Sequence, residues 1–127
     1  MSVYQKKLSF IIGIIFILLS SCSLSTVAPE DFVSNSYKIL KTSSILYDTS
    51  MNTIVDMDEN NKLSTNDKNK VIKYANQYIQ TYQLSVTYLE NYKLGMINKT
   101  EAQTQIDSFL NILNKFIVLV NEIKGDK

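Results

Sequence analysis

Three long stretches after Pro29 carry apolar residues at alternating steps of four and three residues, and this periodicity constrains the fold more than any other feature. An α-helix turns once in about 3.6 residues, so side chains at these steps lie on one face of a helix. No stretch after Pro29 shows the strict alternation of apolar and polar residues that is typical of a strand. The sequence therefore predicts an all-α domain.

Each stretch gives one apolar stripe. The first stripe runs through Val33, Tyr37, Leu40, Ser44, Tyr47, Met51 and Ile54; the second through Ile72, Ala75, Ile79, Tyr82, Val86 and Leu89; the third through Ala102, Ile106, Phe109, Leu113, Phe116, Val120 and Ile123. Pro29 suits the first turn of a helix, and Gly95 suits a left-handed helix end. We expect helices at 30–58, 65–94 and 99–124, which pack as an antiparallel up-down-up three-helix bundle over residues 30–127.

The two predicted turns share one pattern of helix-capping residues. The first turn has Leu63, Ser64 and Asp67, and the second has Ile97, Asn98 and Glu101 at the same offsets. Each set reads as an apolar residue, an N-cap and an acidic third residue of the next helix. The matching sets indicate a weak internal repeat with one helix per unit, in which Leu63 corresponds to Ile97.

The first turn also resembles an EF-hand calcium loop, in the segment DMDENNKLSTND at 56–67. The candidate ligands are Asp56, Asp58, Asn60, the backbone carbonyl of Lys62, Ser64 and Asp67. Asn61 stands where the sharp turn prefers glycine, and Asp67 is shorter than the glutamate that usually closes such a loop. Because the second turn has the same caps without these carboxylates, we expect an ordinary turn. Weak Ca²⁺ binding at the protein surface stays open as the alternative, and no other cofactor is expected.

The chain begins with two lysines, an apolar run from Leu8 to Leu19, and then small residues. A helix that crosses a bilayer needs about 20 apolar residues, and this run has roughly a dozen, which is typical of a signal peptide. An uncleaved anchor stays open as the alternative. We predict a signal peptide at 1–21.

The residues Leu19, Ser20, Ser21 and Cys22 resemble a lipobox, the motif of bacterial lipoprotein precursors. The resemblance covers only the leader. It implies cleavage before Cys22, lipidation of that cysteine, and a lipidated tether over residues 22–29. It also implies a membrane-anchored protein at the outer membrane or cell surface, facing the periplasm or the exterior. Cys22 is the only cysteine, so a disulfide within the chain is excluded.

Charge and composition argue against two classes of function. The net charge is +1 and the chain has no arginine, histidine or tryptophan. Nucleic-acid binding needs clustered positive charge, so we expect no nucleic-acid partner. An enzyme is not expected either, because no pair of side chains stands out as an acid and base or as an activated nucleophile.

Two groups of residues are candidates for binding a partner protein in the envelope. Tyr74, Tyr78, Tyr88 and Tyr92 lie on one flank of the second helix, although tyrosines can also lie along a bundle edge with their hydroxyls in water. Ile112, Val118 and Leu119 widen the apolar surface of the third helix beyond what a three-helix bundle covers. We expect this surface to bind a protein, to self-associate, or to be covered by the N-terminal segment. In size and layout the chain resembles exclusion lipoproteins and pilotins.

Overall fold

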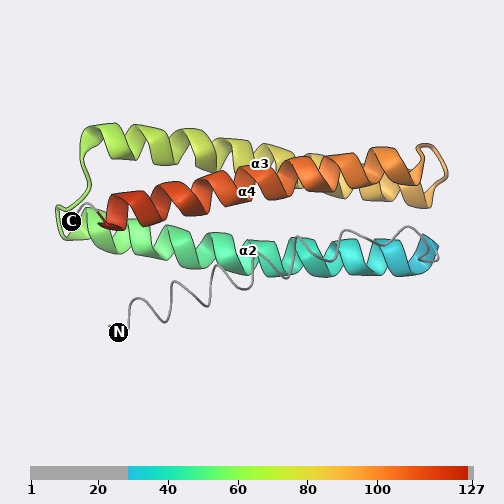
Figure 1. Ribbon diagram of the computed structural model, residues 1–127, viewed down its shortest axis with the longest axis horizontal. Helices are drawn as coiled ribbons and strands as arrows, with labels where there is room; N and C mark the ends of the chain where they lie inside the picture. The colour runs from blue at the N-terminus through green and yellow to red at the C-terminus, as the bar shows by residue number, and fades with distance from the viewer. Residues whose placement is uncertain (1–28, 126–127) are drawn as a thin grey trace.

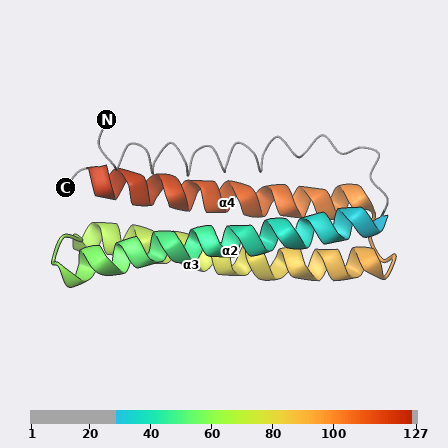
Figure 2. The same cartoon turned by 90° about the horizontal axis from the view of Figure 1, so that it is seen from below.

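The computed structural model describes residues 29–125, which form three helices: α2 (Pro29–Glu59), α3 (Thr65–Lys93) and α4 (Lys99–Gly125) (Figure 1). Successive helices run antiparallel, so that α2 and α4 point the same way (Figures 1 and 2). The predicted all-α three-helix bundle is confirmed, and each helix begins and ends within one residue of its predicted bounds. The predicted signal peptide, Cys22 and the tether up to residue 28 lie outside the described residues.

The α2–α3 turn ends α2 with a Schellman motif. The Lys62 N–H donates to the Met57 carbonyl at 2.8 Å, and the Asn61 N–H donates to the Asp58 carbonyl at 3.0 Å. Asn61 has a φ of +55°, in the left-handed region that this motif requires. Asparagine tolerates this conformation better than other side chains, so the helix stops here without a glycine.

The α3–α4 turn has the same backbone geometry. Gly95 has a φ of +70°, as its predicted role as a left-handed cap requires. The Met96 N–H donates to the Asn91 carbonyl at 2.9 Å and the Gly95 N–H donates to the Tyr92 carbonyl at 3.0 Å. The internal repeat is therefore a repeat of helix, Schellman motif and N-cap.

Both turns begin the next helix with the predicted caps. Asn98 and Glu101 form a reciprocal capping box: the Glu101 N–H donates to Asn98 Oδ1 at 2.9 Å, and the Asn98 N–H donates to Glu101 Oε2 at 2.8 Å. At the other turn the Asp67 N–H donates to Ser64 Oγ at 3.1 Å. Because its side chain is shorter, Asp67 accepts from the Ser64 hydroxyl at 2.7 Å rather than from the backbone.

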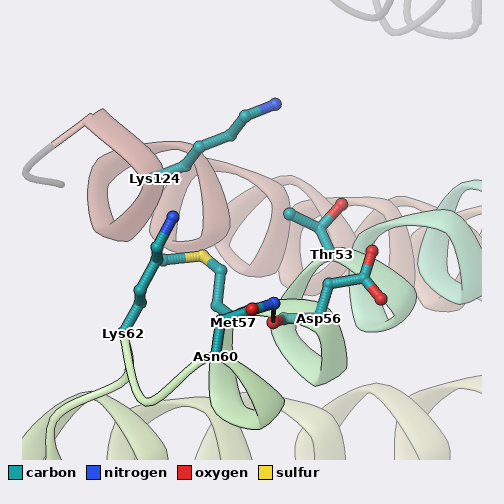
Figure 3. A pocket seen from close by; sticks show the side chains of 6 residues that line it. All are labelled: Thr53, Asp56, Met57, Asn60, Lys62 and Lys124. Carbon is teal, nitrogen blue, oxygen red and sulfur yellow. Dashed lines mark hydrogen bonds between the residues drawn. The ribbon is translucent and has the colours of Figure 1, made fainter.

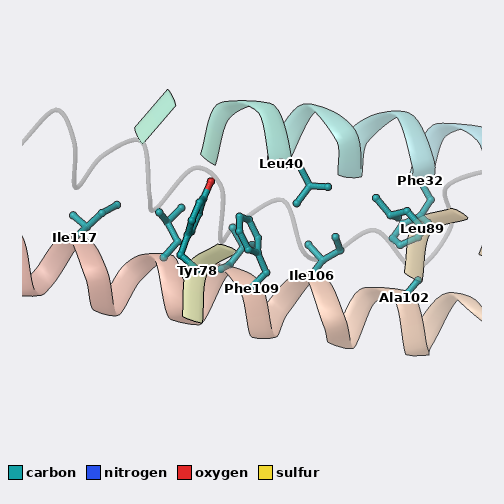
Figure 4. Close-up of a cluster of buried hydrophobic side chains, with 10 residues drawn as sticks. Phe32, Leu40, Tyr78, Leu89, Ala102, Ile106, Phe109 and Ile117 are labelled. Atoms are coloured by element: carbon teal, nitrogen blue, oxygen red, sulfur yellow. The ribbon is translucent and has the colours of Figure 1, made fainter. Parts of the chain in front are cut away.

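α4 supplies most of the core, and its predicted stripe is confirmed. All seven stripe residues are buried, and the stripe is widened by three further buried residues, Leu110, Ile117 and Leu119. Two apolar clusters follow the bundle axis. Phe109 lies in the one nearer the start of α2, which Figure 4 shows, and Phe116 lies in the other. None of the three described helices is long and apolar enough to cross a membrane.

The predicted stripes of α2 and α3 are confirmed only in part: Leu40, Ile54 and Leu89 are buried as predicted, but the buried face of each helix is rotated from its predicted position. α3 buries Val71, Tyr78, Ser85 and Leu89, whereas Ala75, Tyr82 and Val86 are half-buried and Ile72 and Ile79 are 57% and 46% exposed. α2 buries Phe32, Ser36, Leu40, Ser43, Ile54 and Met57, whereas Val33, Tyr37, Ser44, Tyr47 and Met51 are half-buried. On both helices, several buried residues directly precede a predicted stripe residue in the sequence, as Tyr78 precedes Ile79 on α3 and Ser36 precedes Tyr37 on α2.

Aromatic stacking and small side chains explain this rotation. Tyr78 stacks on Tyr47 with ring centroids 3.9 Å apart, and it also contacts Phe109 at 5.4 Å. Ser43 and Ser85 are fully buried, and small side chains at such positions let helices approach closely. Large aromatic contacts in the middle of the bundle therefore set which face of α3 points inward, rather than the hydropathy of single residues.

Candidate interaction surface

The predicted calcium ligands do not form an EF-hand loop, because the first part of the segment is helical. Asp56 and Asp58 lie in the last turn of α2, which ends at Glu59. Asn60 Nδ2 donates to the Asp56 carbonyl at 2.6 Å, as Figure 3 shows. Asp58 Oδ1 is 2.5 Å from Lys68 Nζ, so its carboxylate is paired within the protein.

The remaining calcium candidates serve the turn. The Lys62 N–H closes the Schellman motif, and Ser64 and Asp67 cap α3. Across residues 29–125, no three histidine, cysteine, aspartate or glutamate side chains converge as a metal site would require. In this structure the acidic segment is a helix end followed by a helix start, and weak Ca²⁺ binding by it stays a prediction.

The predicted tyrosine surface is not one surface. Tyr78 is 5% exposed and belongs to the core, so its assignment to partner binding is wrong. Tyr74 and Tyr92 are half-buried and pack against the two apolar clusters, Tyr92 with its ring 5.2 Å from that of Phe32. Tyr88 is half-buried as well. Tyr74, Tyr78 and Tyr92 therefore pack between helices instead of presenting a patch.

The predicted α4 surface is also mostly core. Leu119 is buried in the cluster around Phe116, and Ile112 is half-buried against the other cluster. Only Val118 is exposed, at 46%. A single exposed valine is normal for a protein surface, so these three residues do not form an apolar patch in the described part of the chain.

Three of the exposed apolar residues lie instead on one flank of α3 and on α2: Ile72 and Ile79 on α3, and Val55 on α2. Ile72, Ile79 and the half-buried Val86 recur at the heptad interval, about two helical turns, and so share one side of α3. Val55 on α2 is 46% exposed. We call Val55, Ile72, Ile79 and Val86 the isoleucine flank.

A hydrogen bond between α2 and α3 places Val55 beside this flank. The Tyr37 hydroxyl donates to Glu90 Oε1 across the two helices. Val55 follows Tyr37 by about five full turns of helix, and Ile72 precedes Glu90 by the same number of turns. In an antiparallel pair both steps lead the same way along the bundle. This helix geometry therefore places Val55 and Ile72 at a similar level along the bundle, on the same side as the Tyr37–Glu90 bond.

Tyr37, Glu90 and Lys93 lie on the same side of the bundle, at the end opposite Val55 and Ile72. Burial, and then the hydrogen bond to Glu90, raise the pKa of Tyr37 to about 12. The bond from Tyr37 and the neighbouring Lys93, 3.1 Å away, lower the pKa of the Glu90 carboxyl. The pair thus stays as phenol and carboxylate at neutral pH, and it ties the start of α2 to the end of α3.

An open hollow of about 730 Å³ lies at this same end, between the start of α2 and the α3–α4 turn. Val33, Ile97 and the rings of Tyr37 and Tyr92 supply its apolar lining, and Lys93 is one of its charged residues. The hollow lies on the α2–α3 side, toward the opposite end of the bundle from Val55 and Ile72.

Comparison with known proteins gives no relative from which a role could be transferred: no protein-family model, curated protein or solved structure matches this chain. The assignment of the candidate surface therefore rests on the geometry of the described residues. The signal for it was present in the sequence as adjacent pairs, Val71 with Ile72 and Tyr78 with Ile79, of which only one member of each can face the core.

Proposed function

We propose that this protein is a lipid-anchored bacterial envelope protein that acts through protein–protein contact, and that its isoleucine flank binds the partner. One observation carries the proposal: α3 buries Tyr78 and Ser85 and exposes Ile72 and Ile79. Burying apolar surface contributes about 25 cal/mol per Å², so a helix that served only its own bundle would gain by turning the isoleucines inward. Their exposure is explained if another protein covers them.

The spacing of the flank fits an amphipathic helix as the partner. Ile72, Ile79 and Val86 repeat at the heptad interval, and Val55 extends the row across to α2. A helix laid along α2 and α3 would bury its own apolar stripe against this row, which is the helix-in-groove mode of recognition. It would also convert three helices into a four-helix arrangement.

The anchor part of the proposal rests on the lipobox-like residues that end at Cys22. Two or more acyl chains on that cysteine would hold the bundle stably at a membrane surface. Replacement of Cys22 with alanine should move the protein from the membrane fraction to the soluble fraction. Unchanged fractionation would contradict the anchor.

The partner-binding part is tested by capture from envelope extracts. Ile72→Lys together with Ile79→Lys should abolish capture of the partner, because two desolvated charges would replace the central contacts. Leu84→Lys is the matched control, since Leu84 is 49% exposed on the same helix and points away from the flank. Equal capture by both variants would contradict the proposed surface.

The same variants separate a foreign partner from a second copy of the chain. Light scattering on the purified protein gives its oligomeric state. A dimer that Ile72→Lys and Ile79→Lys dissociate would show self-association and contradict a foreign partner as the occupant. A monomer that captures a secretin tail would support a pilotin role, whereas protection of cells from infection or conjugation would support an exclusion role.

A further inference from the structure

The α3–α4 turn carries the two most exposed large apolar side chains of the described residues, Leu94 at 73% and Met96 at 69%. This turn lies at the same end of the bundle as the start of α2 (Figures 1 and 2). Contacts fix the two together: the Phe32 and Tyr92 rings lie 5.2 Å apart, and Lys99 Nζ is 5.4 Å from the Phe32 ring centre.

The opposite turn shows that the fold does not require these apolar side chains. The internal repeat pairs Leu94 with Asn60 and Met96 with Lys62, and both turns use the same Schellman motif. The α2–α3 turn is therefore polar at the positions where the α3–α4 turn is apolar. The two turns thus share a backbone geometry but differ in the polarity of their exposed side chains. The apolar turn lies at the end of the bundle where α2 begins, which is the end nearer to Cys22 in the sequence.

We propose that Leu94 and Met96 insert into the interfacial zone of the bilayer that holds the Cys22 lipid. This inference rests on the proposed anchor. Cys22 and Pro29 are close in the sequence, and a segment of that length spans at most about 25 Å when fully extended. The 27 residues of α4 extend about 40 Å, so the α3–α4 turn is the end that the anchor holds near the membrane.

The charges at this end favour apolar insertion over attraction to anionic lipid. The charged residues here are Lys93 and Lys99 against Glu30, Asp31, Glu90 and Glu101. Lys93 is paired with Glu90, so no positive patch faces outward around the turn in the described part of the chain. A neutral phosphatidylcholine surface therefore suffices, and the apolar side chains enter the boundary between headgroups and acyl chains.

The chain has no tryptophan, so one introduced tryptophan reports its own surroundings. The full chain is expressed with its leader, purified in lipidated form, and placed in phosphatidylcholine vesicles that contain brominated lipid. Leu94→Trp should show blue-shifted emission that the brominated lipid quenches. Asn60→Trp, the repeat-related position in the other turn, should emit as in water and stay unquenched. Met96→Trp repeats the test at a second position, and circular dichroism verifies folding of each variant.

The outcomes separate this inference from the anchor. If the lipidated protein floats with the vesicles and the tryptophan at 94 is quenched no more than the one at 60, the anchor stands and the insertion is wrong. If the protein does not float, the anchor itself is wrong and the insertion fails with it. Quenching that occurs only in vesicles with phosphatidylglycerol would overturn the apolar mode of insertion in favour of a charge-driven one.

Discussion

Tyr78 combines a favourable and an unfavourable contribution to stability in one side chain. Its ring is central to the aromatic cluster, yet its hydroxyl is buried with no hydrogen-bond partner in the described structure and points away from α4 (Figure 4). Burial also raises the pKa of Tyr78 above its ordinary range. An unpaired buried hydroxyl costs about 1–3 kcal/mol, so here the protein keeps a polar atom at some expense in stability.

Tyr78→Phe should therefore raise the free energy of unfolding, by about 1 kcal/mol, because it keeps the ring and removes the unpaired hydroxyl. Urea denaturation followed by circular dichroism measures the change. Tyr88→Phe, at a half-buried position, should stay within about 0.5 kcal/mol of the wild type. A clear loss of stability in Tyr78→Phe would mean that the hydroxyl is hydrogen-bonded in the folded protein.

The Tyr37–Glu90 pair predicts a dependence on alkaline pH. The folded pKa of Tyr37 is raised from 10.0 to about 12, so its contribution to stability is complete below pH 10 and is lost as pH rises toward 12. The melting temperature of the wild type should fall through this window more steeply than that of Tyr37→Phe. Parallel curves for the two proteins across this window would contradict the role of this bond.

Helices and turns show where prediction from sequence succeeds. The helix ends were predictable because Ser64, Asn98 and Gly95 signal them by local chemistry that acts within a few residues. The buried face of α4 was predictable because its stripe is apolar without interruption. The faces of α2 and α3 were not, because adjacent pairs such as Tyr78 and Ile79 offer two possible stripes, and contacts with other helices select between them.

The turn at Asn61 allows an element-scale test of the calcium question. Asn61→Gly should stabilise the protein by a few tenths of a kcal/mol, because glycine adopts a positive φ at no steric cost. The stabilisation should be the same with calcium and with chelator, because the ion pair of Asp58 and the cap formed by Ser64 and Asp67 require no metal. A gain that appears only with calcium would restore the metal loop.

At the scale of the whole molecule, the topology follows from three amphipathic segments joined by two short turns. The placement of the partner surface did not follow, since the predicted tyrosine and α4 residues are largely core. The isoleucine flank emerges only when α2 and α3 are side by side, with Val55 and Ile72 on the same side of the bundle. A lipid-anchored bundle would then present its α3–α4 turn to the membrane and its α2–α3 side to a partner.

Crosslinking in living cells tests the partner surface most directly. A photo-reactive amino acid replaces Ile79 in one variant and Leu84 in another, two positions of similar exposure on different sides of α3. We predict an adduct with one partner protein from position 79 and none from position 84. Adducts of equal yield from both positions, or from position 84 alone, would contradict the assignment of the isoleucine flank as the site of contact.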